Sequence, residues 1–202
     1  MKLLLTSAGR YNQKVFDFFL TILPKSIDKC SILMVYYKPD GRMSDYIKED
    51  IDFFSNIGCN LDVFNMYEEK NIDTSKKFDV IWVCGGNTFF ILDRMKKTGV
   101  FEFAKKAVLS NESIYFGISA GSIIAGPEIR IAGEAVGDYD ENSINLKDLR
   151  GLNFTNISVF PHFEEYMKSG VDNFRKKANY PIIEITDDEA VFVEDNKYKI
   201  IK

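Results

Sequence analysis

Short apolar segments recur along the chain and limit its possible folds more than any other feature of the sequence. They lack the regular polar–apolar alternation of half-exposed strands, so each of them predicts a buried strand. Segments with helical spacing of apolar residues lie between them; residues 45–57, for example, follow Ser44 and stop at Gly58. This alternation predicts an α/β fold whose mainly parallel sheet carries helices on both faces. The strand-like segments are residues 2–7, 31–37, 61–66, 78–84, 113–118 and 156–161.

The C-terminal segment has a different pattern. Residues 181–202 contain three short β-prone runs, separated by Asp187-Asp188 and by Asp195-Asn196. Runs of this length with polar breaks predict an antiparallel meander that completes the sheet. No internal repeat and no linker rich in Pro, Gly or Ser divides the chain, so we expect a single domain over residues 1–202.

Composition and charge argue against several classes of partner. The net charge is −4, from 26 basic and 30 acidic residues mixed along the chain, which disfavours nucleic acid and anionic membrane as partners. No apolar stretch approaches the ~20 residues of a membrane helix, and the N-terminus lacks a signal-peptide pattern. The three cysteines and the single histidine lack metal-ligand spacing, so we predict a reduced, cytoplasmic protein without metal or cofactor.

Small and polar residues follow four of the predicted strands. Parallel sheets collect their functional groups at the carboxyl ends of the strands, so these segments are expected on one edge of the sheet. A site assembled there would combine a serine, a histidine and glycine-rich turns. The four segments are residues 7–9, 85–88, 117–121 and 161–163.

The segment Gly117-Ile118-Ser119-Ala120-Gly121 matches the pattern G-x-S-x-G between a strand and a helix. In a nucleophile elbow this pattern makes a sharp turn that projects the serine hydroxyl clear of the sheet. The following helix would direct backbone N–H groups toward charge that develops beside Ser119. The alternative is that Gly117 and Gly121 only allow close packing of strand against helix.

His162 is the one histidine of the chain and follows a predicted strand on the same edge as Ser119. A serine of ordinary acidity needs a base to accept its proton, so any Ser–His mechanism must use His162. The alternative is a packed or surface histidine between Phe160 and Phe163.

The turn Gly85-Gly86-Asn87-Thr88 lies between a strand and a helical pattern. Its backbone N–H groups could bind an oxyanion together with the N–H of Ala120. A dinucleotide-binding loop is disfavoured because neither G-x-G-x-x-G nor a Walker lysine is present. An ordinary turn is the remaining alternative.

Together, the segments CGGNTFFIL, GISAGSIIAGPEIR and VFPHF resemble, in order and spacing, the peptidase E (aspartyl dipeptidase) family of serine peptidases, which includes cyanophycinases. The similarity extends over most of the chain. It implies a flavodoxin-like sheet related to class I glutamine amidotransferases, with serine in place of the amidotransferase cysteine. It also implies Ser119 as nucleophile, His162 as base and acid, Gly86 and Ala120 as oxyanion donors, and Asn87 at the substrate site.

The resemblance leaves the acid that orients the histidine open. Glu134, shortly after the segment PEIR, matches the family position, although the aspartyl dipeptidase has aspartate there. Asp138 lies within a few residues of it, and Glu189 resembles an acidic position of the cyanophycinase branch. We rank Glu134 first among the three.

The expected substrate is a small peptide. Aspartyl dipeptidases of the family need a cation for an N-terminal aspartate, and Arg175 lies near the corresponding position, although a solvated helix charge is its alternative role. A broader dipeptidase or aminopeptidase and a cyanophycinase are alternatives within the family. A silent protein that binds a small anion and an amidotransferase-like subunit are alternatives outside it. The resemblance also permits a homodimer.

Overall fold

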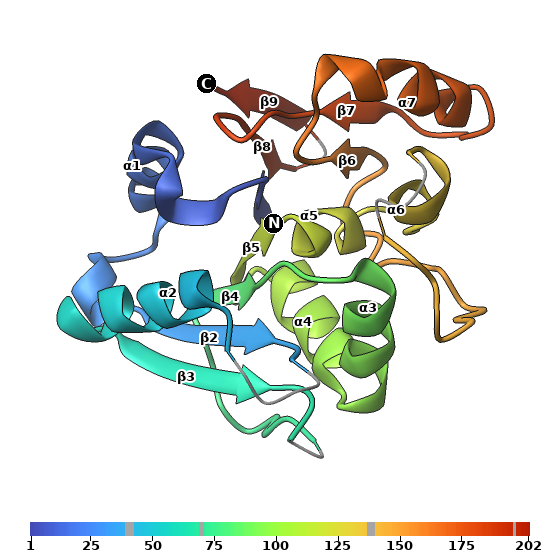
Figure 1. The fold of residues 1–202 in the computed structure, drawn as a ribbon. Coiled ribbons are helices and arrows are strands. Elements are labelled where there is room, and N and C mark those ends of the chain that lie inside the picture. The colour runs from blue at the N-terminus through green and yellow to red at the C-terminus, as the bar shows by residue number, and fades with distance from the viewer. Residues whose placement is uncertain (39–42, 69–70, 137–139, 196) are drawn as a thin grey trace.

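The fold is described here from a computed structural model of the chain, in which residues 1–38, 43–68, 71–136, 140–195 and 197–202 are described. A seven-stranded sheet with the order β3-β2-β4-β5-β1-β8-β9 runs through the molecule (Figure 1). Helices lie on both faces of this sheet. The strands are β1 (Lys2–Thr6), β2 (Ser31–Tyr36), β3 (Asn60–Asn65), β4 (Val80–Val83), β5 (Ile114–Ile118), β8 (Ala190–Glu194) and β9 (Lys197–Ile201).

The first five strands of this order are parallel, and the last two are antiparallel to their neighbours. Strand β1 is where the direction changes. Its residue Leu4 pairs with Phe116 of β5 in a parallel register and with Phe192 of β8 in an antiparallel one. The predictions of a mainly parallel sheet and of antiparallel C-terminal strands are therefore confirmed.

Two short strands depart from the expected pairing. β6 (Ser158–Phe160) and β7 (Ile182–Glu184) pair with each other in parallel, in a separate two-stranded sheet. The sequence predicted β6 in the main sheet and β7 in the C-terminal meander, and both assignments are wrong. A three-residue run is too short for its apolar pattern to specify a partner strand, so the pairing is decided by the surrounding tertiary contacts.

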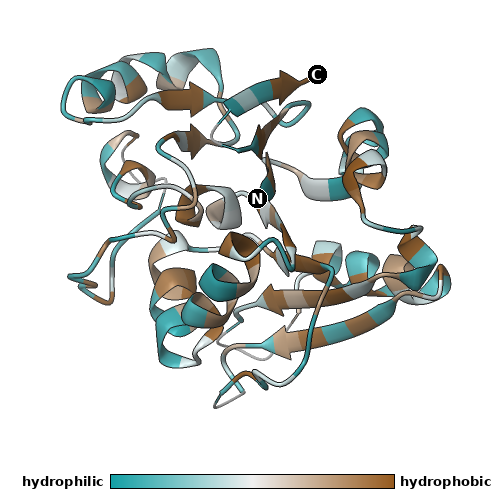
Figure 2. Cartoon of the chain, turned by 180° about the vertical axis from the view of Figure 1, so that it is seen from behind, coloured by the Kyte–Doolittle hydropathy of each residue, from teal (hydrophilic) through white to brown (hydrophobic). Residues whose placement is uncertain are grey.

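Alternate side chains of the strands point to opposite faces of the sheet and form two apolar layers. Leu4 packs in the layer that contains Phe19 and Trp82, whereas Leu3 and Leu5 lie in the other layer. In Figure 2 the strands are largely brown and the helices alternate between brown and teal, as expected for helices with one buried face. The first layer is covered by α1 (Gln13–Ile22) and α2 (Asp45–Asn56), the second by α3 (Thr88–Lys97), α4 (Val100–Leu109), α5 (Ala120–Ile124), α6 (Ile131–Glu134) and α7 (Lys168–Arg175).

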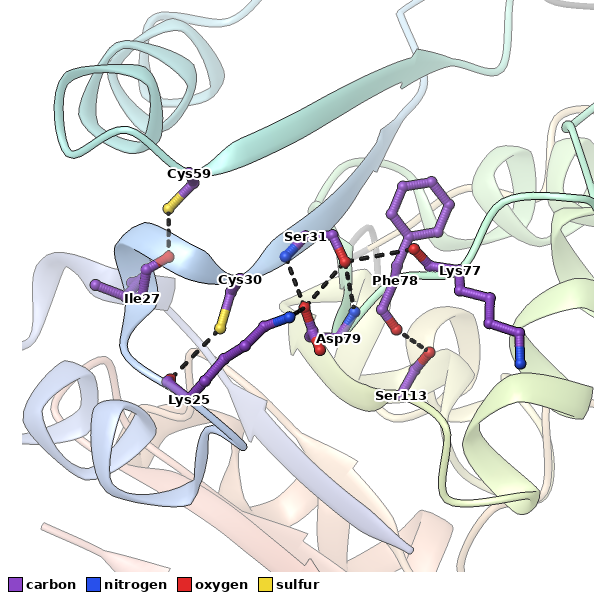
Figure 3. Close-up of polar contacts among 9 residues, drawn as sticks. All are labelled: Lys25, Ile27, Cys30, Ser31, Cys59, Lys77, Phe78, Asp79 and Ser113. Atoms are coloured by element: carbon purple, nitrogen blue, oxygen red, sulfur yellow. Dashed lines mark hydrogen bonds and ion pairs between the residues drawn. The ribbon is translucent and has the colours of Figure 1, made fainter.

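The amino ends of the strands are joined by a polar network around Asp79 (Figure 3). The Asp79 carboxylate accepts hydrogen bonds from the backbone N–H of Ser31 at 2.7 Å and from its hydroxyl at 2.9 Å, and pairs with Lys25 Nζ at 2.9 Å. Burial alone would raise the pKa of Asp79, but the Ser31 hydrogen bonds and the Lys25 ion pair outweigh it and lower the pKa. This network ties β2 to the segment that enters β4.

None of the helices in the described residues is long and apolar enough to cross a membrane.

Candidate active site

The carboxyl ends of β1, β4, β5 and β6 converge on one pocket of about 350 Å³. Its lining includes Ser7, Gly85, Gly86, Ser119 and His162, one or more residues from each of the four segments that the sequence placed on this edge. The convergence predicted from the strand pattern is confirmed. The pocket joins a hydroxyl, an imidazole and a glycine-rich turn.

Ser119 occupies a strained turn between β5 and α5. Its backbone angles are φ 51° and ψ −111°, a region that residues with a side chain rarely adopt. The turn is held from both sides: the Ser119 N–H donates to the carbonyl of Thr6 at 2.9 Å, and the Ser119 carbonyl accepts from the N–H of Ser122 at 2.8 Å. Strain of this kind at a strand–helix corner is the geometry of a nucleophile elbow.

The glycines around Ser119 are required by packing. A Cβ on Gly121 would collide with the carbonyl oxygen of Val83, and one on Gly117 would lie 2.8 Å from the backbone of Gly121. A Cβ on Gly85 would lie 3.1 Å from the Ser119 Cβ. The packing interpretation of G-x-S-x-G is therefore correct, and it does not compete with the elbow interpretation, because close packing is what allows the sharp turn.

His162, two residues beyond the end of β6, also has a positive φ, 54°. Its backbone N–H donates to the hydroxyl of Ser7 at 3.0 Å, and this hydroxyl donates to the carbonyl of Ile185 at 3.3 Å. Ser7 is only 1% exposed, so its bonds are made away from water. A buried serine at the end of β1 thus fixes the backbone conformation that turns the imidazole into the pocket.

Asp187 is the carboxylate in contact with the imidazole. Its Oδ1 lies 2.5 Å from His162 Nδ1, and the two side chains are 65% and 37% exposed, respectively. This contact places the proton of a neutral imidazole on Nδ1 and leaves Nε2 as the ring nitrogen that can accept a proton. Asp187 thus occupies the position of an orienting acid.

The acids that the sequence proposed lie elsewhere. Glu134, ranked first, is exposed on α6, and its carboxylate lies 3.8 Å from Arg130. Glu189 accepts from the Thr186 N–H at 3.1 Å and pairs with the Lys202 ammonium at 2.8 Å. Neither contacts His162, so the structure corrects both assignments in favour of Asp187, and Asp138 lies outside the described residues.

The Ser119 hydroxyl is not hydrogen-bonded to His162 or to any other described residue. Catalytic hydrogen bonds are often long in the free enzyme and shorten when substrate binds. Ser119 and His162 therefore share a pocket as separate groups in this state.

Two backbone N–H groups border Ser119. Ala120 is the first residue of α5, so its N–H has no intrahelical acceptor. Gly86 has a φ of 144°, which is a conformation for glycine, and it lines the pocket with Ser119. Gly86 lines the pocket and Ala120 follows Ser119 directly in the chain, and their role as oxyanion donors stays a prediction.

The structure places Asn87 and Arg175 away from this pocket's lining. The side-chain Oδ1 of Asn87 caps α3 by accepting from the N–H groups of Phe89 and Phe90, each at 3.1 Å. The Arg175 guanidinium on α7 pairs with Asp172 and, at 2.7 Å, with Glu184. Their predicted contact with substrate is not supported by this geometry, because cap and ion-pair contacts already occupy both side chains.

The pocket has other polar groups that the sequence did not single out. Lys38 lines it and is the one Lys or Arg among the described lining residues. Tyr46 lines it as well, and its hydroxyl donates to the Gly85 carbonyl at 2.9 Å; burial raises the pKa of this phenol. Burial and a hydrogen bond to Glu49 raise the pKa of Tyr11 to about 12. In the described residues no cluster of three or more His, Cys, Asp or Glu side chains could hold a metal ion.

Asp187 was missed because the sequence marked it only as a break between β runs. Its neighbour Glu189 was considered, so the segment was identified but the residue was not. Lys38 and Tyr46 follow β2 and start α2, a place where the carboxyl-end rule could have found them. Neither belongs to a short motif, which is why pattern reading passed over them.

Comparisons with known proteins place the chain among peptidases. A sequence model of peptidase family S51 matches residues 3–201. An uncharacterized peptidase of Listeria monocytogenes is 32% identical over 124 residues, which is 58% of either chain. An uncharacterized peptidase of Pasteurella multocida is 25% identical over 93% of this chain and 92% of its own length.

Two further comparisons carry the name peptidase E. The peptidase E of a Nostoc strain is 29% identical over 54% of this chain and 42% of its own length. A crystal structure of a candidate peptidase E from Listeria monocytogenes EGD-e superposes with a TM-score of 0.77 at 22% identity, covering 100% of this chain and 98% of that one. At this identity the superposition shows a shared fold.

Proposed function

The chain belongs to peptidase family S51, and on that premise we propose that it is a serine peptidase that cleaves small peptides through an acyl-enzyme. The observation that carries the proposal is the arrangement of Ser119 and His162 on one pocket, with Asp187 2.5 Å behind the imidazole. A strained serine, a base and an acid that orients the base are the three parts that acyl transfer needs.

The mechanism assigns one role to each group. His162 Nε2 accepts the proton of the Ser119 hydroxyl as the oxygen attacks the peptide carbonyl, while Asp187 stabilises the imidazolium. The N–H groups of Gly86 and Ala120 stabilise the oxyanion. His162 then protonates the leaving amine, and a water molecule deprotonated by the same ring hydrolyses the acyl-enzyme.

The size of the pocket favours short substrates. About 350 Å³ is near the lower end of the range for small-molecule sites and corresponds to a peptide of a few residues. The proposal is therefore an exopeptidase or dipeptidase. A protease that reads a long extended segment would need a groove with sites on both sides of the nucleophile.

Lys38 supports a preference for substrates that carry a carboxylate near the cleaved bond. It is the one cationic side chain of Lys or Arg type among the described lining residues, and none of these described residues is Asp or Glu. An ammonium in a partly closed, largely apolar pocket attracts a carboxylate more strongly than one in open solvent. This carboxylate is either the side chain of an N-terminal Asp or the free C-terminus of a dipeptide.

A panel of dipeptides with free and amidated C-termini tests both proposals. We expect wild type to cleave, Ser119→Ala to show no turnover, and Lys38→Met to raise KM about tenfold for peptides with the recognised carboxylate. If the effect of Lys38→Met on KM disappears when the C-terminus is amidated, Lys38 binds the free C-terminal carboxylate. If the effect is confined to peptides with an N-terminal Asp, Lys38 binds the side chain of that Asp. Arg175→Met is the matched control, because it removes a cation outside the pocket lining; we expect it to leave the KM values for the dipeptide panel unchanged.

Two results would overturn the proposed function. Tight binding of small carboxylates without turnover of any peptide would indicate an anion-binding protein. Release of ammonia from glutamine, with no cleavage of peptide bonds, would indicate an amidotransferase-like activity. If Lys38→Met leaves every KM unchanged, the assignment of Lys38 is wrong although the peptidase proposal stands.

A further inference from the structure

The hydroxyl of Tyr46 contacts the turn that borders Ser119. Tyr46 lies in the first turn of α2, and its Oη donates to the carbonyl of Gly85 at 2.9 Å, across 39 residues of sequence. It makes the one hydrogen bond to this carbonyl from a described residue. Tyr46, Gly85 and Gly86 all line the pocket that contains Ser119.

The peptide unit that joins Gly85 to Gly86 links this hydroxyl to the oxyanion site. Cis peptide bonds are absent from the described chain, and in a trans peptide the C=O and the following N–H point in opposite directions. A bond that fixes the Gly85 carbonyl therefore also fixes the direction of the Gly86 N–H. It polarises the same peptide unit, which makes that N–H a stronger donor.

This peptide unit needs an external tether because glycine stands on both sides of it. Without Cβ atoms, Gly85 and Gly86 have access to backbone angles on both sides of φ = 0, so the plane between them can rotate at low cost. Gly86 is held at φ 144°, which is far from the helical and strand regions. A hydrogen bond to the carbonyl is the direct way to select one orientation.

The helix that carries Tyr46 is itself anchored on the same side. Asp50 lies one turn further along α2, is 1% exposed, and bonds to Arg10 Nε at 2.6 Å. Arg10 belongs to the short helical turn Gly9–Tyr11 that follows β1. The helix that carries the tyrosine ring is thus tied to the turn that follows β1.

We propose that Tyr46 is a positioning residue for the oxyanion hole: its hydroxyl holds the Gly85–Gly86 peptide with the Gly86 N–H directed at the oxyanion. This rests on the proposed function, because an oxyanion forms only if Ser119 attacks a carbonyl. Loss of the hydroxyl lets the peptide rotate, which weakens the stabilisation of the transition state and leaves binding of the ground state in place.

The test is Tyr46→Phe, which keeps the ring and removes the hydroxyl. We expect kcat per active site to fall ten- to a hundredfold with KM changed less than threefold, and a peptide boronate or trifluoromethyl ketone, whose oxyanion occupies the hole, to bind weaker by a similar factor. Active sites are counted with a fluorophosphonate. Tyr180→Phe removes a hydroxyl that donates to Glu128 at 2.6 Å, outside the pocket lining, and should leave kcat and inhibitor affinity unchanged.

Each alternative gives a different result. A purely structural role would lower the melting temperature of Tyr46→Phe while kcat per titrated site and inhibitor affinity stay at the wild-type values, and this would overturn the inference. A rise in KM alone would also overturn it, because it would make Tyr46 a binding residue. If wild type itself cleaves no peptide, the proposed function fails first, which separates the two failures.

Discussion

The two ends of the central sheet differ in how far their polar groups are hydrogen-bonded and in how strained their backbone is. At the amino ends, Asp79 is surrounded by donors from Ser31 and Lys25 in a satisfied network (Figure 3). At the carboxyl ends, Ser119 and His162 have positive φ angles and the Ser119 hydroxyl has no partner among the described residues. Conformational strain and unmade hydrogen bonds cost stability and are retained where a site must be ready to react. Substitutions at the first end should therefore change folding, and substitutions at the second should change activity.

The largest expected effect is at Ser119. Ser119→Ala should lower kcat/KM by about 10⁵-fold or more, since removal of a triad nucleophile is the most damaging single change. Ser119→Gly should be equally inactive yet more stable than Ser119→Ala by about 1 kcal/mol, because glycine adopts φ 51° without strain. Peptide hydrolysis measures the activity of both variants, and urea unfolding measures the difference in their stability. A less stable Ser119→Gly would contradict the strain account.

Asp187 should come next. Asp187→Asn should lower kcat by about 10²–10⁴-fold, because an amide no longer stabilises the imidazolium or its tautomer. The neighbouring Asp188→Asn is the matched control, since Asp188 accepts from Asn12 at 3.1 Å and not from the imidazole. The kcat values of both variants on one dipeptide show whether Asp187 is the acid that orients His162. Equal activity of wild type and Asp187→Asn, with loss in Glu134→Gln, would restore the assignment made from the sequence.

At the amino end, Asp79→Asn should leave kcat unchanged and lower the free energy of unfolding by about 1–3 kcal/mol, because it weakens the hydrogen bonds from the half-buried Ser31 and the ion pair with Lys25. The pKa of Asp79 is lowered in the folded protein, so its contribution is present above the unfolded pKa, near 4, and is lost as pH falls through the folded value. The deficit of the variant should therefore shrink in acid.

The matched control for Asp79 is Asp62→Asn. This change breaks a surface pair with Lys76 and should cost less than about 1 kcal/mol. Chemical denaturation at pH 7 and pH 3 gives the comparison. A loss of activity in folded Asp79→Asn would show that the two ends are coupled.

The last expected effect is on the pH dependence of stability and concerns Asp50. Burial raises the pKa of Asp50 to about 6, against the opposing effect of Arg10. A raised pKa means that its contribution to stability is full below the unfolded value, near 4, and is lost as pH rises through about 6. In wild type, the free energy of unfolding should therefore decline between about pH 4 and pH 6, by on the order of 1 kcal/mol per unit of pKa shift. Asp50→Asn should abolish this decline. An unchanged pH profile would show that Asp50 does not titrate there.

The sequence allowed the sheet, its carboxyl-end site and the residues Ser119, His162 and Gly86 to be predicted, because each follows an apolar run whose direction is determined by the parallel fold. Asp187 could not be predicted in the same way, since its contact with His162 depends on how one short loop closes after β7. The ion pair of Arg175 with Glu184 could not be predicted, because it joins a helix to a strand that sequence patterns do not pair. Local periodicity thus locates strand ends, and loop closure decides which neighbouring side chains meet.

The claim that Ser119 is a nucleophile activated by His162 is tested most directly by covalent labelling with a fluorophosphonate, followed by intact mass measurement and peptide mapping. We predict one adduct on folded wild type, located at Ser119, absent in Ser119→Ala and formed at least about 100-fold more slowly in His162→Ala. Folded wild type that stays unmodified, or an adduct that maps to another residue, would contradict it.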